Sequence, residues 1–327
     1  MKTVKETDSK VIEAHSIVNR CRDEIAKRII GQEKMVSSML MGLIAGGHVL
    51  IEGVPGLAKT LAVKTLSEVL DVSYKRIQFT PDLLPADLIG TMVYRQESGK
   101  FTPRKGPVFS NIVLADEINR APAKVQSALL EAMQEQQVTI GDETYKLKAP
   151  FFVLATQNPI EHEGTYPLPE AQLDRFILKL SVGYPDMEEE LEILNRMGDE
   201  KEIPVSKVLN PAHIETLKKT ARNIKIDSRV ESYIVSIAAA SRPVNNINAD
   251  FMHYIEFGAS PRASIFLHRC SKINALFNKR DYVVPEDVKS VVHEVLRHRI
   301  ILNYEAESEG LTTDIVIDEI LKFVQVP

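Results

Sequence analysis

The residues whose chemistry is clearest form a glycine-rich segment, Gly53–Thr60, with the sequence GVPGLAKT. Such a loop turns backbone N–H groups inward, and the N-terminus of the helix that follows favours an anion. Lys59 can reach phosphate oxygens, and the Thr60 hydroxyl can be a ligand of Mg²⁺. The pattern usually has glycine before the lysine, and here Ala58 occupies that position. We expect Ala58 to enter the helix, where its methyl group can be tolerated. The segment predicts a phosphate-binding loop; the alternative is a Gly/Pro turn with an exposed lysine.

A second candidate segment, Asn111–Glu117, places an acidic pair after four apolar residues. The apolar run indicates a buried strand, and ligands of open α/β sheets bind beyond the carboxyl ends of strands. Asp116 would hold Mg²⁺ through its water shell, and Glu117 would polarise the attacking water of phosphoryl transfer. A strand that ends in solvated acids is the alternative. That alternative is weakened by the phosphate-binding loop one strand–helix unit upstream.

Three further polar residues could complete such a site. Asn158 follows another apolar run, and its amide could bond a γ-phosphate or the lytic water; an ordinary Asn-Pro turn is the alternative. Arg175 precedes a buried run and could stabilise a transition-state phosphate, or simply pair with Asp174. Arg262 follows the expected N-cap Ser260, where a positive charge opposes the helix dipole unless a phosphate lies nearby.

The elements that position these residues change in character near residue 184. Before it, apolar strands alternate with helices, which predicts a parallel sheet covered on both faces. The expected strands are 48–52, 112–115, 151–155 and 176–180, with a hairpin at 138–147 and helices at 8–28, 33–45, 60–70 and 122–136. The expected later helices are 186–199, 211–223, 227–241, 261–278 and 285–300. We therefore expect an α/β domain, residues 1–184, and an all-α domain with a C-terminal tail, residues 185–327.

Composition narrows the class of protein. The formal net charge of −5 gives no general attraction to nucleic acid, and acidic residues dilute the basic cluster within residues 95–105. Cys21 and Cys270 are expected to be ordinary thiols, because no metal-binding spacing occurs. The N-terminus lacks the apolar core of a signal peptide, and the longest apolar stretch, Met39–Ile51, is too short to span a bilayer. These features predict a cytoplasmic protein without membrane insertion.

Together these segments resemble the AAA+ ATPases, and among them the MoxR family of the helix-2-insert clade. Gly53–Thr60 resembles the Walker A motif, including the alanine that this family often carries, and Val113–Glu117 resembles Walker B. The segment Ile30-Gly31-Gln32 is similar to the adenine-side segment of the family. Residues 86–108 resemble an insert within helix 2, and residues 138–147 resemble the hairpin before sensor 1. The similarity extends over about residues 20–300.

The resemblance implies a P-loop AAA+ core with an all-α lid, which hydrolyses ATP with Mg²⁺. Asn158 corresponds to sensor 1, Arg175 to the arginine finger and Arg262 to sensor 2; with Glu117 they form the expected catalytic set. Thr60 and Asp116 are the expected metal ligands. The expected nucleotide-binding residues are Ile30, Gly53, Val54, Pro55, Gly56, Leu57, Ala58, Lys59, Thr60 and Leu61.

The resemblance also implies partners. It predicts a ring, expected to be a hexamer, in which Arg175 reaches the ATP of a neighbouring subunit. It predicts a chaperone-like role with a von Willebrand factor A-domain protein, in the maturation or activation of a client complex. Whether Arg262 acts in its own subunit or in a neighbour stays open, as does the role of Arg120. The alternatives are a metal-chelatase-like motor subunit and a non-hydrolysing nucleotide switch, and the intact Glu117 speaks against the switch.

Overall fold

The computed structural model describes residues 2–160, 164–198, 203–243 and 249–327. The chain forms two units, which we call the α/β unit and the helical unit. The α/β unit comprises Asn19–Phe176 and Leu180–Ile214, and the helical unit comprises Met1–Val18, Ile177–Lys179 and Glu215–Pro327. Within the described residues, no helix is both long enough and apolar enough to cross a membrane.

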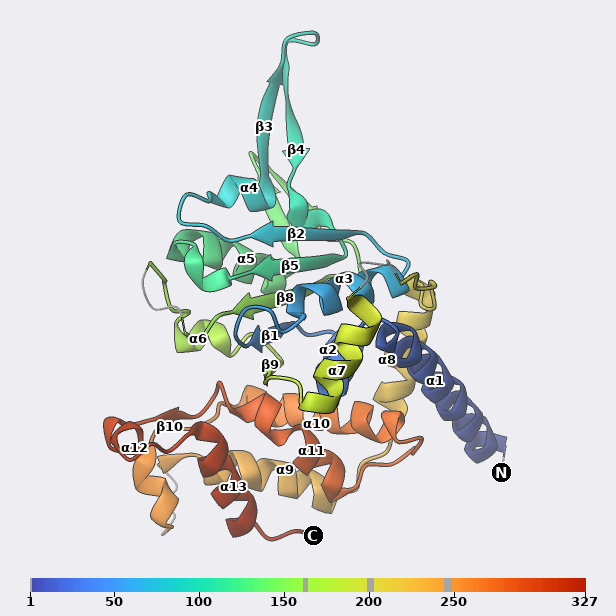
Figure 1. Ribbon diagram of the computed structural model, residues 1–327, viewed down its shortest axis with the longest axis vertical. Coiled ribbons are helices and arrows are strands. Elements are labelled where there is room, and N and C mark those ends of the chain that lie inside the picture. Colours follow the sequence, from blue (N-terminus) through green and yellow to red (C-terminus); the bar gives the residue numbers. More distant parts are fainter. Residues whose placement is uncertain (1, 161–163, 199–202, 244–248) are drawn as a thin grey trace. The chain divides into compact units, whose positions relative to one another are not determined.

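A five-stranded sheet of order β2-β5-β8-β1-β9 lies at the centre of the α/β unit (Figure 1). The neighbours β2 and β5, β5 and β8, and β8 and β1 pair in parallel, so their carboxyl ends meet at one edge. The strands are β1 Val49–Glu52, β2 Tyr74–Gln78, β5 Ile112–Asp116, β8 Phe152–Gln157 and β9 Leu178–Ser181. The parallel sheet is thus confirmed, and the strand that sequence reasoning missed is β2.

The helices of this unit confirm the predicted pattern to within a few residues. They include α2 Glu33–Ala45, α3 Lys59–Val69 and α5 Ala123–Glu135. Val125, Leu129 and Met133 form the buried stripe of α5 and join one hydrophobic core with sheet residues. Burial of each large apolar side chain contributes about 1.5–3 kcal/mol, so this core fixes the sheet edge where the candidate site lies.

Within residues 86–108, residues 90–105 form a projecting two-stranded ribbon. The short helix α4 Pro85–Ile89 leads into β3 Gly90–Arg95, which pairs in antiparallel fashion with β4 Lys100–Lys105 (Figure 1). Tyr94 and Phe101 lie opposite each other, with ring centroids 5.3 Å apart. The predicted hairpin at 138–147 is confirmed as β6 Gln137–Ile140 and β7 Glu143–Lys146.

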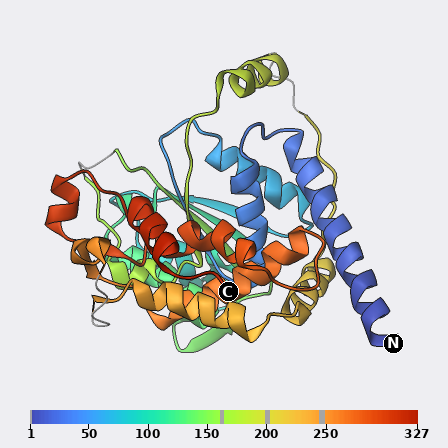
Figure 2. The same cartoon turned by 90° about the horizontal axis from the view of Figure 1, so that it is seen from below.

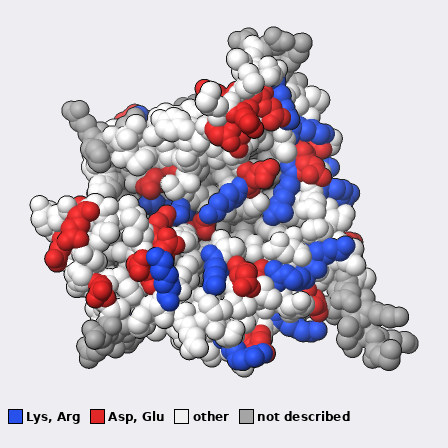
Figure 3. Space-filling model, turned by 60° about the horizontal axis from the view of Figure 1, so that its bottom comes forward, with Lys and Arg blue, Asp and Glu red and all other residues white. Residues whose placement is uncertain are grey.

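The helical unit confirms most of the later helices. They are α8 Pro211–Asn223, whose residues up to Ile214 are assigned to the α/β unit, α9 Ser228–Ala240, α10 Pro261–Phe277, α11 Pro285–Leu296 and α13 Thr313–Phe323, shown from gold to red in Figure 2. Neither α13 nor the short α12 Tyr304–Ser308 was predicted. The unit is also not purely helical, because β10 Ile255–Phe257 pairs with β11 Ile301–Leu302. Basic and acidic side chains lie close together over much of the face in Figure 3.

Two helices lie near the boundaries that divide the chain into its units. Helix α1 spans Lys2–Ala26, so it begins before the predicted range of 8–28 and ends two residues before its predicted end; both units take part of it. Helix α7, Met187–Met197, belongs to the α/β unit. The last residue of its predicted range, residue 199, lies outside the described residues. Cys21 and Cys270 are both buried and free of disulfides, as the sequence predicts.

His48 joins β1, β8 and α5 from a buried position just before β1. Its side chain is 5 % exposed. Nδ1 accepts a hydrogen bond from the backbone N–H of Val153 at 3.0 Å, and Nε2 lies 3.2 Å from the carbonyl of Met133. Since Nδ1 is the acceptor, the proton is on Nε2, and both neutral-ring interactions are satisfied. Burial lowers the pKa of His48 from 6.5 to about 4.

This lowered pKa predicts acid sensitivity. Protonation of His48 favours the unfolded chain. The stability that the neutral ring contributes to the folded protein is therefore complete above pH 6.5 and is lost as the pH falls towards 4. The shift corresponds to about 3 kcal/mol of unfolding free energy. We expect urea unfolding at a series of pH values to show this loss in the wild type. A His48→Gln variant should be less stable at pH 7 but have a flatter pH profile; equal slopes for both proteins would contradict the assignment.

Candidate active site

The loop between β1 and α3 surrounds the Lys59 side chain. Its ammonium donates to the carbonyl of Gly53 and, at 3.2 Å, to that of Val54. Gly56 has a φ of 88°, a conformation that glycine adopts without a steric penalty. Partial burial lowers the pKa of Lys59, while the carboxylates of Asp116, Glu117 and Glu52 act in the opposite direction. A part-buried cation at the start of a helix is the arrangement that phosphate binding requires.

Ala58 does not enter the helix, so the expectation for this residue is wrong. Helix α3 begins at Lys59, and Ala58 precedes it with φ 53° and ψ 14°. Glycine, which the usual pattern has at this position, can adopt this left-handed conformation at no steric cost, whereas it costs an alanine roughly 1–2 kcal/mol. The loop therefore imposes a glycine-like backbone on a residue that has a side chain.

Replacement of Ala58 by glycine should stabilise the protein. The strain energy that is relieved exceeds the free-energy cost of the greater freedom of glycine in the unfolded chain. We expect the free energy of unfolding to rise by about 0.5–1 kcal/mol. Urea unfolding without nucleotide measures the difference. Ala62→Gly, a change of the same type inside α3, should lower stability instead. A loss of stability in Ala58→Gly would show that the backbone there is not strained.

Asp116 ends β5 in a buried position, and its side chain bonds to residues of β2, β8 and α3. Its Oδ1 accepts from the Thr156 hydroxyl at 2.5 Å. Its Oδ2 lies 3.4 Å from the Thr60 hydroxyl and accepts from Arg76 at 2.6 and 2.9 Å. The oxygens of Thr60 and Asp116 are therefore neighbours, and oxygen ligands are the type that Mg²⁺ prefers.

Glu117 is held at both its backbone and its side chain. Its N–H donates to the Thr156 hydroxyl at 2.9 Å, and its φ of 55° is left-handed. The carboxylate accepts from Gln78 at 2.6 Å and pairs with Arg120 at 3.2 Å. Strained backbone of this kind is often found at functional sites. Arg120, whose role the sequence leaves open, thus lies against the candidate catalytic acid.

Asn158 supplies a buried donor at the end of β8. The residue is 4 % exposed, and its Oδ1 accepts from the N–H of Ile160 at 3.3 Å. Its Nδ2 is buried and has no hydrogen-bond partner among the residues that the structure describes. A buried donor left unpaired costs about 1–3 kcal/mol, and an acceptor on a bound ligand would remove that cost.

A cavity of about 370 Å³ brings these groups together. It is lined by Pro55, Gly56, Leu57, Ala58, Lys59, Thr60, Leu61, Arg76, Asp116, Glu117, Thr156, Gln157 and Asn158. The lining combines two cations, Lys59 and Arg76, with backbone N–H groups, the amide donor of Asn158 and adjacent oxygen ligands. This donor set fits a nucleotide phosphate chain with a divalent cation.

Other predicted residues lie outside this lining. Gly53 and Val54 contact Lys59 through their carbonyls, as described above. Ile30 lies in the connection between α1 and α2, where the neighbouring Gln32 donates to the Gly183 carbonyl. Arg175 is partly buried and donates to the carbonyl of Leu130 at 2.8 Å. Arg262 lies in the first turn of α10, and its N–H bonds to the N-cap side chain, as predicted.

Sequence reasoning did not identify Arg76 and Gln78, which bond to the two acids. Both belong to β2, whose side chains alternate between the faces of the sheet, so residues two apart lie on the same face. The register pairs Gln78 with Asp116. The only signal in the sequence was two polar side chains at alternate positions of Tyr74–Gln78. That signal is too weak to identify site residues unless the segment is already known to be a strand.

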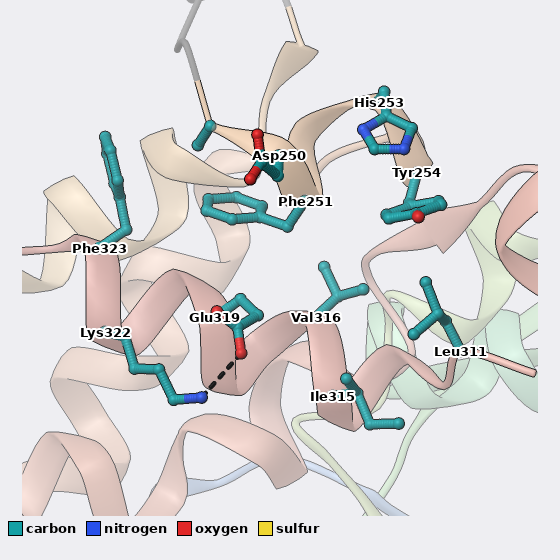
Figure 4. Close-up of a pocket in the computed structure, with 11 residues that line it drawn as sticks. Asp250, Phe251, His253, Tyr254, Leu311, Ile315, Val316, Glu319, Lys322 and Phe323 are labelled. Atoms are coloured by element: carbon teal, nitrogen blue, oxygen red, sulfur yellow. Dashed lines mark hydrogen bonds and ion pairs between the residues drawn. The ribbon is translucent and has the colours of Figure 1, made fainter. Parts of the chain in front are cut away.

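The helical unit contains a cavity of its own, of about 440 Å³, between the segment Asp250–Tyr254 and α13 (Figure 4). Apolar side chains line much of it, including Phe251 and Val316, and the charged pair Glu319–Lys322 lies along α13. No predicted site residue contributes to it. Over the described part of the chain, no cluster of three or more His, Cys, Asp or Glu could hold a metal ion.

Comparison with known proteins agrees with the geometry. The model of the "ATPase family associated with various cellular activities (AAA)" matches residues 48–178, and that of the AAA lid domain matches residues 249–320. Chaperone MoxR1 of Mycobacterium tuberculosis is 49 % identical over 96 % of this chain and 83 % of its own length. YeaC of Bacillus subtilis is 42 % identical over 96 % of both chains.

A solved structure gives the same result. The crystal structure of a candidate ATPase from Cytophaga hutchinsonii matches with a TM-score of 0.93 and 50 % identity, and it covers 100 % of both chains. Its similarity thus includes the sheet that positions the acids and the helices of the lid. On the strength of these matches and the site geometry, the chain belongs to the MoxR family of AAA+ ATPases.

Proposed function

We propose that this ATPase is an Mg²⁺-dependent remodelling chaperone that works as a ring. The observation that carries the proposed site is the cavity in which Lys59, the Thr60–Asp116 oxygen pair, Glu117 and the unpaired Nδ2 of Asn158 converge. ATP would bind with its phosphates on the loop, residues 53–61, and Thr60 and Asp116 would hold Mg²⁺. The metal supplies charge neutralisation of the phosphates.

The remaining chemistry belongs to side chains of this chain. Glu117 is proposed to orient and polarise the attacking water, and Asn158 to donate to the γ-phosphate or to that water. Gln78 and Arg120 hold the Glu117 carboxylate, so they are proposed to set its position. Ile30 is proposed to contact the adenine. Arg262 is proposed as a phosphate-side cation, either in its own subunit or in a neighbouring one.

Arg175 is proposed to act on the nucleotide of a neighbouring subunit in a hexamer. A mixing experiment tests this directly, because Lys59→Ala and Arg175→Ala subunits lack different parts of a shared site. If Arg175 acts in trans, mixed rings recover ATPase activity, since a Lys59→Ala subunit still offers its arginine to a neighbour's intact loop. Light scattering with ATP should show the ring. Activity no greater than the sum of the separate variants would contradict the shared site.

The chaperone role is supported by the similarity to Chaperone MoxR1. We propose that the ring works in the cytoplasm on a client complex together with a von Willebrand factor A-domain protein. A Glu117→Gln subunit should retain ATP and therefore hold its client. We expect pull-downs with ATP to recover these partners with Glu117→Gln but not with Lys59→Ala. The same recovery with both variants would show that capture does not depend on the nucleotide cycle.

A further inference from the structure

Arg76 occupies the Asp116 oxygen that lies beside Thr60. Its Nε and Nη2 donate to Oδ2 at 2.9 and 2.6 Å, and Nη2 also donates to the Gln78 side chain at 3.0 Å. The other oxygen of Asp116 is taken by the Thr156 hydroxyl at 2.5 Å. The guanidinium therefore bonds to Oδ2, which is the Asp116 oxygen that could bind the same ligand as the Thr60 hydroxyl.

We propose that Arg76 is a positioning residue of the nucleotide site, which competes with the divalent cation for Asp116 and replaces its charge until the metal binds. The inference rests on the proposed function, since that assigns Thr60 and Asp116 to the metal. It makes Arg76 the residue that sets how strongly nucleotide binding depends on Mg²⁺.

Charge balance in the cavity explains why such a residue is useful. Asp116 is only 7 % exposed, and Glu117 lies beside it. A phosphate chain that enters beside these acids is repelled unless a cation neutralises them, and opposite charges in contact provide that neutralisation. Arg76 offers it at Asp116 without a metal. A divalent cation at the same oxygen would repel the guanidinium, so the two cations exclude each other there.

The Arg76 side chain is able to leave. Half of its surface is exposed (50 %), whereas the Asp116 side chain is 10 % exposed. Among the described residues, its only other side-chain hydrogen bond is to Gln78, which is an exposed neighbour on the same strand. The guanidinium also lines the same cavity as the phosphate-binding loop. Displacement by metal therefore moves it within the site and does not require the core to rearrange.

A purely structural ion pair between β2 and β5 is the competing explanation, and it predicts a different result. Loss of a structural pair lowers stability and leaves metal dependence unchanged. Loss of a competitor has two effects. The affinity for nucleotide without metal falls, and the Mg²⁺ concentration that is needed for tight binding also falls. The distinguishing readout is thus the metal dependence of binding and not ATPase activity.

The experiment measures binding of the fluorescent analogue mant-ADP to the full chain, in EDTA and over a range of Mg²⁺ concentrations. In EDTA, Arg76→Gln should bind about tenfold more weakly than wild type, the effect of one charge-assisted bond. Its half-saturating Mg²⁺ concentration should be several-fold lower. Arg76→Lys, which keeps the charge, should lie between the two proteins. Arg95→Gln, on the exposed ribbon, should match wild type.

Urea unfolding of each variant shows whether the fold is intact, so a change in stability is recorded separately from binding. Identical affinities in EDTA and identical Mg²⁺ midpoints for wild type and Arg76→Gln would overturn the inference, whatever the stabilities. Failure of wild type to bind mant-ADP under any condition is a different outcome. It would overturn the proposed nucleotide site, and the role of Arg76 with it.

Discussion

Glu117→Gln is expected to stop ATP hydrolysis while ATP binding is preserved. Glutamine matches glutamate in size and can still accept the Gln78 hydrogen bond, but it cannot attract a proton from the attacking water. Loss of a positioned base typically reduces the rate by about 10²–10⁴-fold. Steady-state phosphate release gives the rate, and mant-ATP titration gives the affinity.

Glu135→Gln is the matched control for this prediction, because Glu135 is an exposed glutamate at the end of α5. It should hydrolyse ATP at the wild-type rate. Turnover by Glu117→Gln within about threefold of wild type, well below the loss expected for a base, would remove Glu117 from the proposed role. Loss of both binding and turnover would instead indicate that the carboxylate is needed to form the site.

Lys59→Ala is expected to weaken nucleotide binding by about 10–100-fold, the value of a hydrogen bond to a charged group. The ammonium is the cation of the loop itself, and its bonds to Gly53 and Val54 place it beside the phosphate position. Titration with mant-ADP at saturating Mg²⁺ measures the loss. Hydrolysis should fall with occupancy.

Lys64→Ala, in the same helix, is the control for Lys59→Ala. Lys64 is 54 % exposed and pairs with Glu68 at 3.8 Å, so its removal should change affinity little. Urea unfolding should show that both variants are folded. Wild-type affinity in Lys59→Ala would mean that the loop does not bind the phosphates through this residue.

Sequence patterns predicted the parts of the fold that are buried on both sides. The run Ile112–Ala115 is fully buried in the sheet, so its continuous apolar character identified the strand and located Asp116 and Glu117. β2 is an edge strand, and only Ile77 of its residues is buried, so no apolar run marked it. The ribbon residues 90–105 are largely exposed, which removed the pattern there as well.

The same difference decided which site residues were predicted. Loop and acidic residues carry their chemistry in local sequence, and Asn158 follows a buried strand. Arg76 and Gln78 were missed because their importance depends on the register between β2 and β5, which local sequence does not encode. The left-handed backbone of Ala58 was missed because loop closure, and not the preference of alanine, determines it.

The central claim is that Asp116, the last residue of β5, and Glu117, which follows it, carry out the hydrolysis of the ATP that the loop binds. The direct test loads the protein with ATP in EDTA, adds excess Mg²⁺, and follows phosphate release through a single turnover in wild type and Glu117→Gln at equal occupancy. We predict release of the bound γ-phosphate from wild type and none from the variant on the same time scale. Equal release from both proteins, or no release from wild type, would contradict the account.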